Sequence, residues 1–148
     1  TAQLQAALAS DQRATTMAGF CATVAAALIA GGVSYWDKTS SLPPLLATFA
    51  AAAMLLCAGG FAAWAARPID FYFPGNQPCQ WFPVRDIPLV ELLGGEAENY
   101  DERIEINDAK LGENQRAIYD GFWFALASPV VAALVWAVAE AISLSYPV

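Results

Sequence analysis

Few side chains in this chain could do chemistry, and their spacing does not favour a catalytic site. The cysteines are Cys21, Cys57 and Cys79, and histidine is absent. No two cysteines form a CxxC pair, so the sequence indicates neither a zinc site nor a redox dithiol. Histidine-ligated haem, histidine-rich metal sites and histidine-dependent acid–base catalysis cannot be built from this chain alone. We expect no catalytic residue, metal or cofactor, and a protein that is not an enzyme.

Glu140 is the one ionised residue inside a long apolar stretch of the sequence. An ionisable group within a membrane is a functional candidate by default. Yet Glu140 lies about one turn from the end of its stretch and is followed by Ser143 and Ser145, so it could reach a membrane surface. Three interpretations stay open: an interfacial carboxylate, a contact with a partner, or a role in moving a proton or an ion.

Three apolar stretches must position these residues. They cover residues 14–36, 45–66 and 121–144, and none contains Lys or Arg. About 20 apolar residues suffice for a helix to cross a hydrocarbon core of ~30 Å. Hydrophobic residues make up 57% of the 148 residues and charged residues 14%, which is typical of membrane proteins. The sequence predicts an all-α integral membrane protein with a single three-span domain over 1–148.

The cations predict how the spans are oriented. Arg13 precedes the first span, Lys38 follows it, and the other five cations lie in the segment 67–120. With three crossings, six of the seven cations share one side of the membrane. The positive-inside rule then places the N-terminus and 67–120 in the cytoplasm, and the loop 37–43 and the C-terminus outside the cell membrane.

The net charge of −7 narrows the choice of partners. Carboxylates cluster between Asp86 and Asp120, which argues against nucleic-acid binding and against a polybasic lipid-binding tail. We therefore expect as partners other membrane protein subunits or the chain itself, together with lipid, and no nucleic acid.

The first part of the cytoplasmic segment is rich in proline and aromatic residues. Prolines at 68, 74, 78 and 83 forbid a continuous helix over 69–83. We predict an irregular loop at the membrane interface. Its candidate contact residues are Phe71, Tyr72, Phe73, Trp81 and Phe82. The rings could anchor the loop in the headgroup zone, or they could form a binding surface for a partner or an amphiphile.

The rest of this segment predicts helix. Residues 87–93 fit a short helix that Gly94 and Gly95 stop, and a second helix runs from about 96 to 144 with at most mild interruption near Gly121 and Pro129. Alternating spacing of four and three residues defines a seam of an amphipathic helix. The seam residues are Tyr100, Ile104, Asn107, Leu111, Asn114 and Ile118. The seam could pack against the chain's own helices or against another protein, and 67–120 is too short to form an independent domain.

Small residues recur four apart on each span, which lets helix backbones approach closely. These residues are Ala22, Ala26 and Ala30 in the first span, Ala58 with Ala62 and Gly59 with Ala63 in the second, and Ala133 with Ala137 in the third. Three spans cannot cover all of these faces with one another, so we expect one flank to contact another polypeptide.

A short motif precedes the first span. Asp11-Gln12-Arg13-Ala14 resembles an Asp-x-Lys/Arg-Ala pattern found at the same place in small bacterial multi-span proteins, including transmembrane effectors of anti-phage systems. The leading hypothesis is a non-catalytic accessory or structural subunit of a larger bacterial inner-membrane complex. The resemblance, which covers four residues, nominates the alternative: a self-assembling transmembrane effector or pore. A small transporter, hinted at by Pro129 after Ser128, is a third interpretation.

Overall fold

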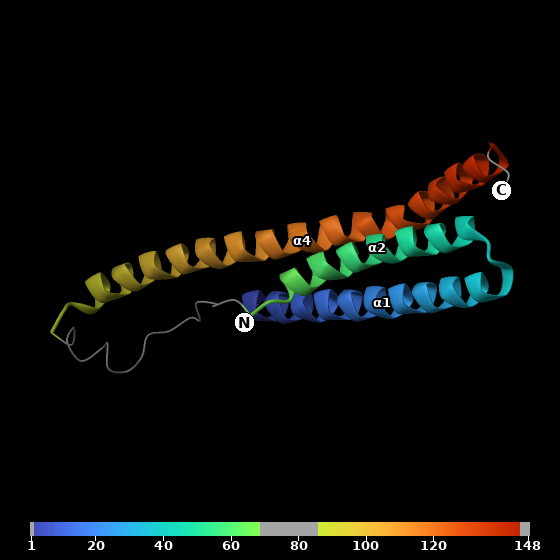
Figure 1. The fold of residues 1–148 in the computed structure, drawn as a ribbon. Helices are drawn as coiled ribbons and strands as arrows, with labels where there is room; N and C mark the ends of the chain where they lie inside the picture. Colours follow the sequence, from blue (N-terminus) through green and yellow to red (C-terminus); the bar gives the residue numbers. More distant parts are fainter. Residues whose placement is uncertain (1, 69–85, 146–148) are drawn as a thin grey trace. The chain divides into compact units, whose positions relative to one another are not determined.

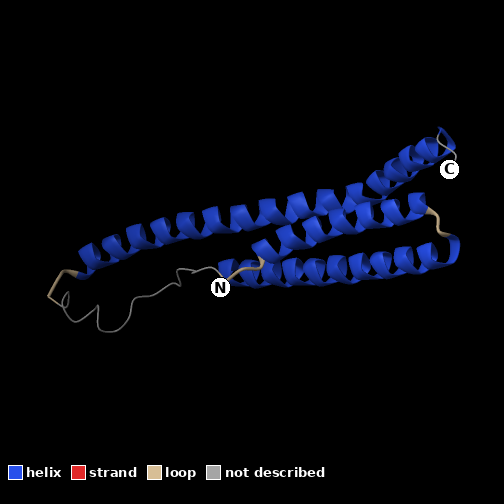
Figure 2. Cartoon of the chain, in the orientation of Figure 1, coloured by secondary structure: helices blue, strands red, loops and turns tan. Residues whose placement is uncertain are grey.

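The computed structural model describes residues 2–68 and 86–145 and is all-α over these residues (Figures 1 and 2). Its helices are α1 (Ala2–Thr39), α2 (Leu42–Ala65) and α4 (Leu89–Ser145). All three are long and apolar enough to cross a membrane, as the sequence predicts. The proline- and aromatic-rich loop, with its candidates Phe71, Tyr72, Phe73, Trp81 and Phe82, lies outside the described residues.

The turn between α1 and α2 is shorter than predicted. Only Ser40 and Ser41 lie between the two helices. Ser40 has a positive φ of 52°, and its backbone N–H donates to the carbonyl of Trp36 at 2.8 Å. Ser40 thus ends α1 as a C-terminal cap in the left-handed conformation, a position usually occupied by glycine. Pro43 and Pro44 begin α2 in its first turn, where a missing N–H removes no helix bond.

Helix α4 begins earlier than predicted, because Gly94 and Gly95 do not stop it. The backbone N–H of Leu92 already donates to the carbonyl of Pro88 at 3.0 Å. Neither glycine adopts the left-handed conformation of a helix C-cap. A glycine inside a helix lowers stability by about 1 kcal/mol relative to alanine, but it leaves the hydrogen bonds intact. The prediction that residues 87–93 form a separate helix is therefore wrong.

The chain divides into two compact units, Thr1–Arg67 with Asn114–Val148, and Pro68–Glu113. In the first unit, α1 and α2 pack together over much of their length and connect through the tight turn (Figure 1). The C-terminal part of α4 packs on them through Phe124 and Ala125. Pro129 lies inside α4, and Figure 1 shows α4 changing direction in this part, as expected at a helical proline.

Candidate interaction surfaces

The first unit is held together by small side chains at heptad spacing. On the described part of α1 the buried residues are Ala7, Ala14, Cys21, Ala25 and Gly32. On α2 they include Ala51, Leu55, Ala58, Ala62 and Ala65. Spacings of three, four and seven residues keep each set on one helix face. Small side chains let the backbones approach, so that dispersion between close-packed atoms stabilises helix pairs even in lipid.

Helix α4 continues the predicted seam into its apolar part. Asn107, Asn114, Gly121 and Ser128 lie seven residues apart, and all four are buried. The side chains of Asn107 and Asn114 are each 3% exposed. The second row of the seam is more open, since Leu111 and Ile118 are half-buried and Ile104 is exposed. Tyr100, at the start of the seam, is half-buried.

Helix α4 lies close to α2 at Gly121. A Cβ atom on Gly121 would lie 2.8 Å from the carbonyl oxygen of Ala58 and 3.3 Å from the Cβ of Phe61. Next to this contact, the rings of Phe61 and Phe124 stack with centroids 5.4 Å apart. One turn beyond Phe124, the Ser128 hydroxyl donates to the carbonyl of Ala51 at 3.1 Å. These contacts fix the position of α4 against α2 within the unit.

Polar residues mark one end of the first unit. Ala14, Ala65 and Ala117 form one buried cluster, which brings the ends of the three apolar stretches to the same level. Arg13, Arg67 and Arg116 flank this cluster in sequence. The Arg67 guanidinium lies 4.1 Å from the centre of the Trp64 ring, a cation–π contact.

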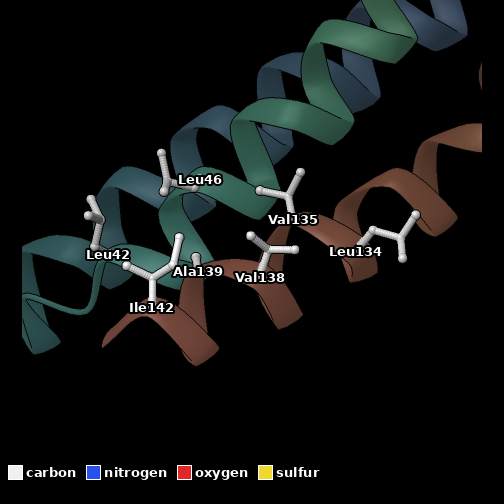
Figure 3. A pocket seen from close by; sticks show the side chains of 7 residues that line it. All are labelled: Leu42, Leu46, Leu134, Val135, Val138, Ala139 and Ile142. Carbon is white, nitrogen blue, oxygen red and sulfur yellow. The ribbon is translucent and has the colours of Figure 1, made fainter. Parts of the chain in front are cut away.

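Two grooves open along the C-terminal part of α4. The first, which we call the Pro129 groove, has a volume of about 580 Å³. It is lined by all three helices, with Leu28, Thr48, Ser128, Pro129 and Trp136 among its residues. The second, the aliphatic groove, has a volume of about 440 Å³ and lies between α2 and α4 (Figure 3). Its lining is Leu42, Leu46, Leu134, Val135, Val138, Ala139 and Ile142.

The small-residue faces named from the sequence have different surroundings. Ala58 and Ala62 are buried, and Gly59 faces α1, where its Cβ would lie 3.4 Å from that of Cys21. Ala63 is exposed. The remaining small residues, Ala22, Ala26, Ala30, Ala133 and Ala137, are exposed as well. The faces used inside the unit are therefore other ones on α1 and α4.

Glu140 is exposed near the C-terminal end of α4. Its backbone carbonyl accepts a hydrogen bond from the Ser143 hydroxyl at 2.8 Å. In the part of the chain that the structure describes, no three His, Cys, Asp or Glu side chains are grouped as a metal site would need.

Exposed aliphatic side chains also form a surface that was not predicted from the sequence, which we call the aliphatic patch. Its residues are Ile87, Leu89, Val90 and Leu93, in the unit Pro68–Glu113. Val90 is 83% exposed and Leu89 is 67% exposed. The apolar run 87–93 was the only sign of this patch in the sequence. The run has no helical periodicity, so it did not indicate which of its side chains are exposed.

Comparison with known proteins does not add a relative from which a site could be transferred. No protein family, no curated protein and no solved structure matches this chain.

Proposed function

We propose that this protein is a non-catalytic accessory or structural subunit of a larger bacterial membrane complex. The observation that carries the proposal is the aliphatic patch, because it lies outside the three apolar stretches, where lipid tails are not expected to cover it. Exposed patches of large apolar side chains in contact with water are typical of protein interfaces. Exposed acidic residues lie next to the patch in the sequence, among them Glu91 and Glu98.

The partner surface that suits this patch is a basic, apolar protein surface. We infer from the cation distribution that the patch is cytoplasmic. The cytoplasmic leaflet carries negative charge and attracts basic segments, so it would repel this acidic one. A protein surface that combines Lys or Arg with apolar side chains would complement both the charge and the exposed aliphatic residues.

The apolar part of α4 supports the same proposal. The most apolar stretch of α4 is the least buried of the three. Within the protein, 6% of its residues are buried, compared with 17% for α1 and 33% for α2. Exposed aromatic residues on α4 include Phe122, Trp123 and Trp136. Lipid could cover this face, but helices of neighbouring subunits pack on such faces too.

The alternative is a self-assembling transmembrane effector or pore. The observation in its favour is a group of exposed hydroxyl residues on α1, namely Thr15, Thr16 and Thr23. Each hydroxyl donates to a carbonyl of its own helix, at 2.7–2.8 Å. These threonines occupy only the first half of the apolar stretch, whereas a water-filled pore requires polar groups along the whole crossing.

The test is the mass of the native particle extracted in mild detergent, measured for three chains. The first is the wild type, the second carries Val90→Asp and Leu93→Asp, and the third carries the control Asn99→Asp, at an exposed position on the opposite side of the same helix from Val90. We expect the wild type and the control to purify with a second protein in fixed ratio. Loss of a central interface residue costs about 2 kcal/mol, or roughly thirtyfold in affinity, so the double variant should be released.

Recovery of the wild type as a lone monomer would overturn the proposal. A particle made only of this chain would favour the self-assembling effector. A hetero-complex that survives both aspartates would move the interface away from the aliphatic patch.

A further inference from the structure

The Pro129 groove differs from an ordinary gap between helices because polar atoms occur among its apolar walls. Its volume of about 580 Å³ is within the usual range for small-molecule sites. Val24 and Leu28 of α1, Leu55 of α2 and Trp136 of α4 form apolar parts of the lining. Thr48 and Ser128 add one hydroxyl each.

The hydroxyl hydrogens of Thr48 and Ser128 already form hydrogen bonds within the protein. Thr48 donates to the carbonyl of Leu45 at 2.8 Å, and Ser128 donates to the carbonyl of Ala51 at 3.1 Å. A hydroxyl group has one hydrogen but two acceptor lone pairs. Toward a ligand, Thr48 and Ser128 therefore act as hydrogen-bond acceptors.

Pro129 adds a third acceptor. Proline has no backbone N–H, so the carbonyl of Ala125, four residues earlier, loses its usual helix donor. Ala125 also lines the groove. In membrane helices a nearby Ser or Thr often bonds to such a carbonyl. Here the neighbouring Ser128 hydroxyl points to Ala51 on α2 instead.

We propose that the Pro129 groove binds a membrane-soluble amphiphile with an apolar body and a neutral hydroxyl group, such as a long-chain alcohol. The hydroxyl donates its single hydrogen to the Ala125 carbonyl, in a groove that also holds the Thr48 and Ser128 hydroxyls, and the apolar body lies against Leu28, Leu55 and Trp136. A neutral donor fits better than a cation, since the lining contains no carboxylate to offset the cost of burying a charge.

The aliphatic groove provides an internal control. It is of similar size, at about 440 Å³, and it lies on the same two helices, α2 and α4 (Figure 3). All of its lining residues are aliphatic, so its side chains offer no hydrogen-bond acceptor. An apolar chain should enter it whether or not the ligand carries a hydroxyl.

The test uses the full chain in phospholipid nanodiscs and two photoreactive probes. One is a long-chain primary alcohol with a diazirine in its chain, and the other is its methyl ether, which has no hydrogen to donate. Labelled peptides are mapped by mass spectrometry. One good hydrogen bond corresponds to about tenfold in affinity, so the alcohol should label the Pro129 groove about tenfold more than the ether. Both probes should label the aliphatic groove equally.

Pro129→Ala is the deciding variant. It restores a backbone N–H for the Ala125 carbonyl, removes that acceptor, and favours the helix, so it should fold. We expect it to lower labelling of the groove by the alcohol toward the level of the ether, without changing labelling of the aliphatic groove. Equal labelling of the Pro129 groove by both probes would overturn the proposal. So would alcohol labelling that Pro129→Ala leaves unchanged, or cross-links that join this groove to a second polypeptide.

Discussion

The two halves of the three-helix unit differ in how closely α4 approaches α2. Up to Ser128, the heptad positions of α4 hold Asn114, Gly121 and Ser128, and these residues are buried. The next position is Val135, which is only half-buried and lines the aliphatic groove, and the α4 residues that line the Pro129 groove run from Ala125 to Trp136. The branched side chains of Leu134, Val135 and Val138 line the aliphatic groove at this level, and Pro129 precedes them inside α4. One heptad register thus gives a close-packed half and an open half, depending on side-chain size.

The largest effect should come from Gly121→Ala. Its new Cβ would lie 2.8 Å from the backbone oxygen of Ala58, which cannot rotate away. Overpacking of this kind costs about 3 kcal/mol, so the free energy of unfolding in detergent should fall by that amount. Gly60→Ala is the control, because its Cβ would meet nothing within 4 Å. Equal stability of the two variants would show that α4 does not approach α2 at Gly121.

A smaller loss of stability is expected for Gly32→Ala, near the C-terminal end of α1. The new Cβ would overlap the hydroxyl oxygen of Thr48. Because a side chain can move where a backbone cannot, we expect a loss of about 1–2 kcal/mol in the free energy of unfolding. Thr48→Ala in the same chain should restore most of this loss, whereas Gly31→Ala alone should cost nothing by contact. Failure of the double variant to recover would refute the Gly32–Thr48 contact.

Ser128→Ala should have a still smaller effect. It removes the hydrogen bond between α4 and α2, and such bonds in membranes contribute about 0.6 kcal/mol on average. The same unfolding titration measures this loss. Ser143→Ala, which removes only a hydroxyl bond within α4, is the control and should change stability less. A larger loss in the control would contradict the assignment of Ser128 to the helix contact.

The smallest effect should come from Ala133→Leu in the open half. Ala133 is exposed and lines the Pro129 groove, so a larger apolar side chain has room there. We expect a change within about 0.5 kcal/mol, as for other exposed positions. The contrast with Gly121→Ala measures the difference between the two halves. A loss as large as that of Gly121→Ala would mean that the groove is filled in the native protein.

Much of the fold could be predicted from the sequence because long uncharged stretches and heptad spacing are properties of local composition. These signals predicted the three long apolar helices. The role of Gly94 and Gly95 was not predicted, since a glycine pair stops a helix only if its backbone turns left-handed, which composition does not specify.

The helix faces that pack together were harder to predict. Alanines four apart occur on several faces of α1, and their spacing is the same whether the face is buried, as at Ala25, or exposed, as at Ala26. Gly121 and Ser128 extend the spacing of Asn107 and Asn114 by whole heptads, so following the seam into the apolar stretch would have found them. The two grooves depend on where α4 bends, which requires coordinates in three dimensions.

The central claim is that hydrocarbon surrounds the apolar helices, and spin-label accessibility in lipid vesicles tests it most directly. With the native cysteines replaced, single labels are placed at Leu126 and Val130, which are exposed on α4, and at Ala109, which lies outside the apolar stretch. Labels at 126 and 130 should collide with dissolved oxygen and hardly with a water-soluble nickel complex, whereas the label at 109 should do the reverse. If the nickel complex reached Val130 as readily as Ala109, water would surround this helix and the account would be contradicted.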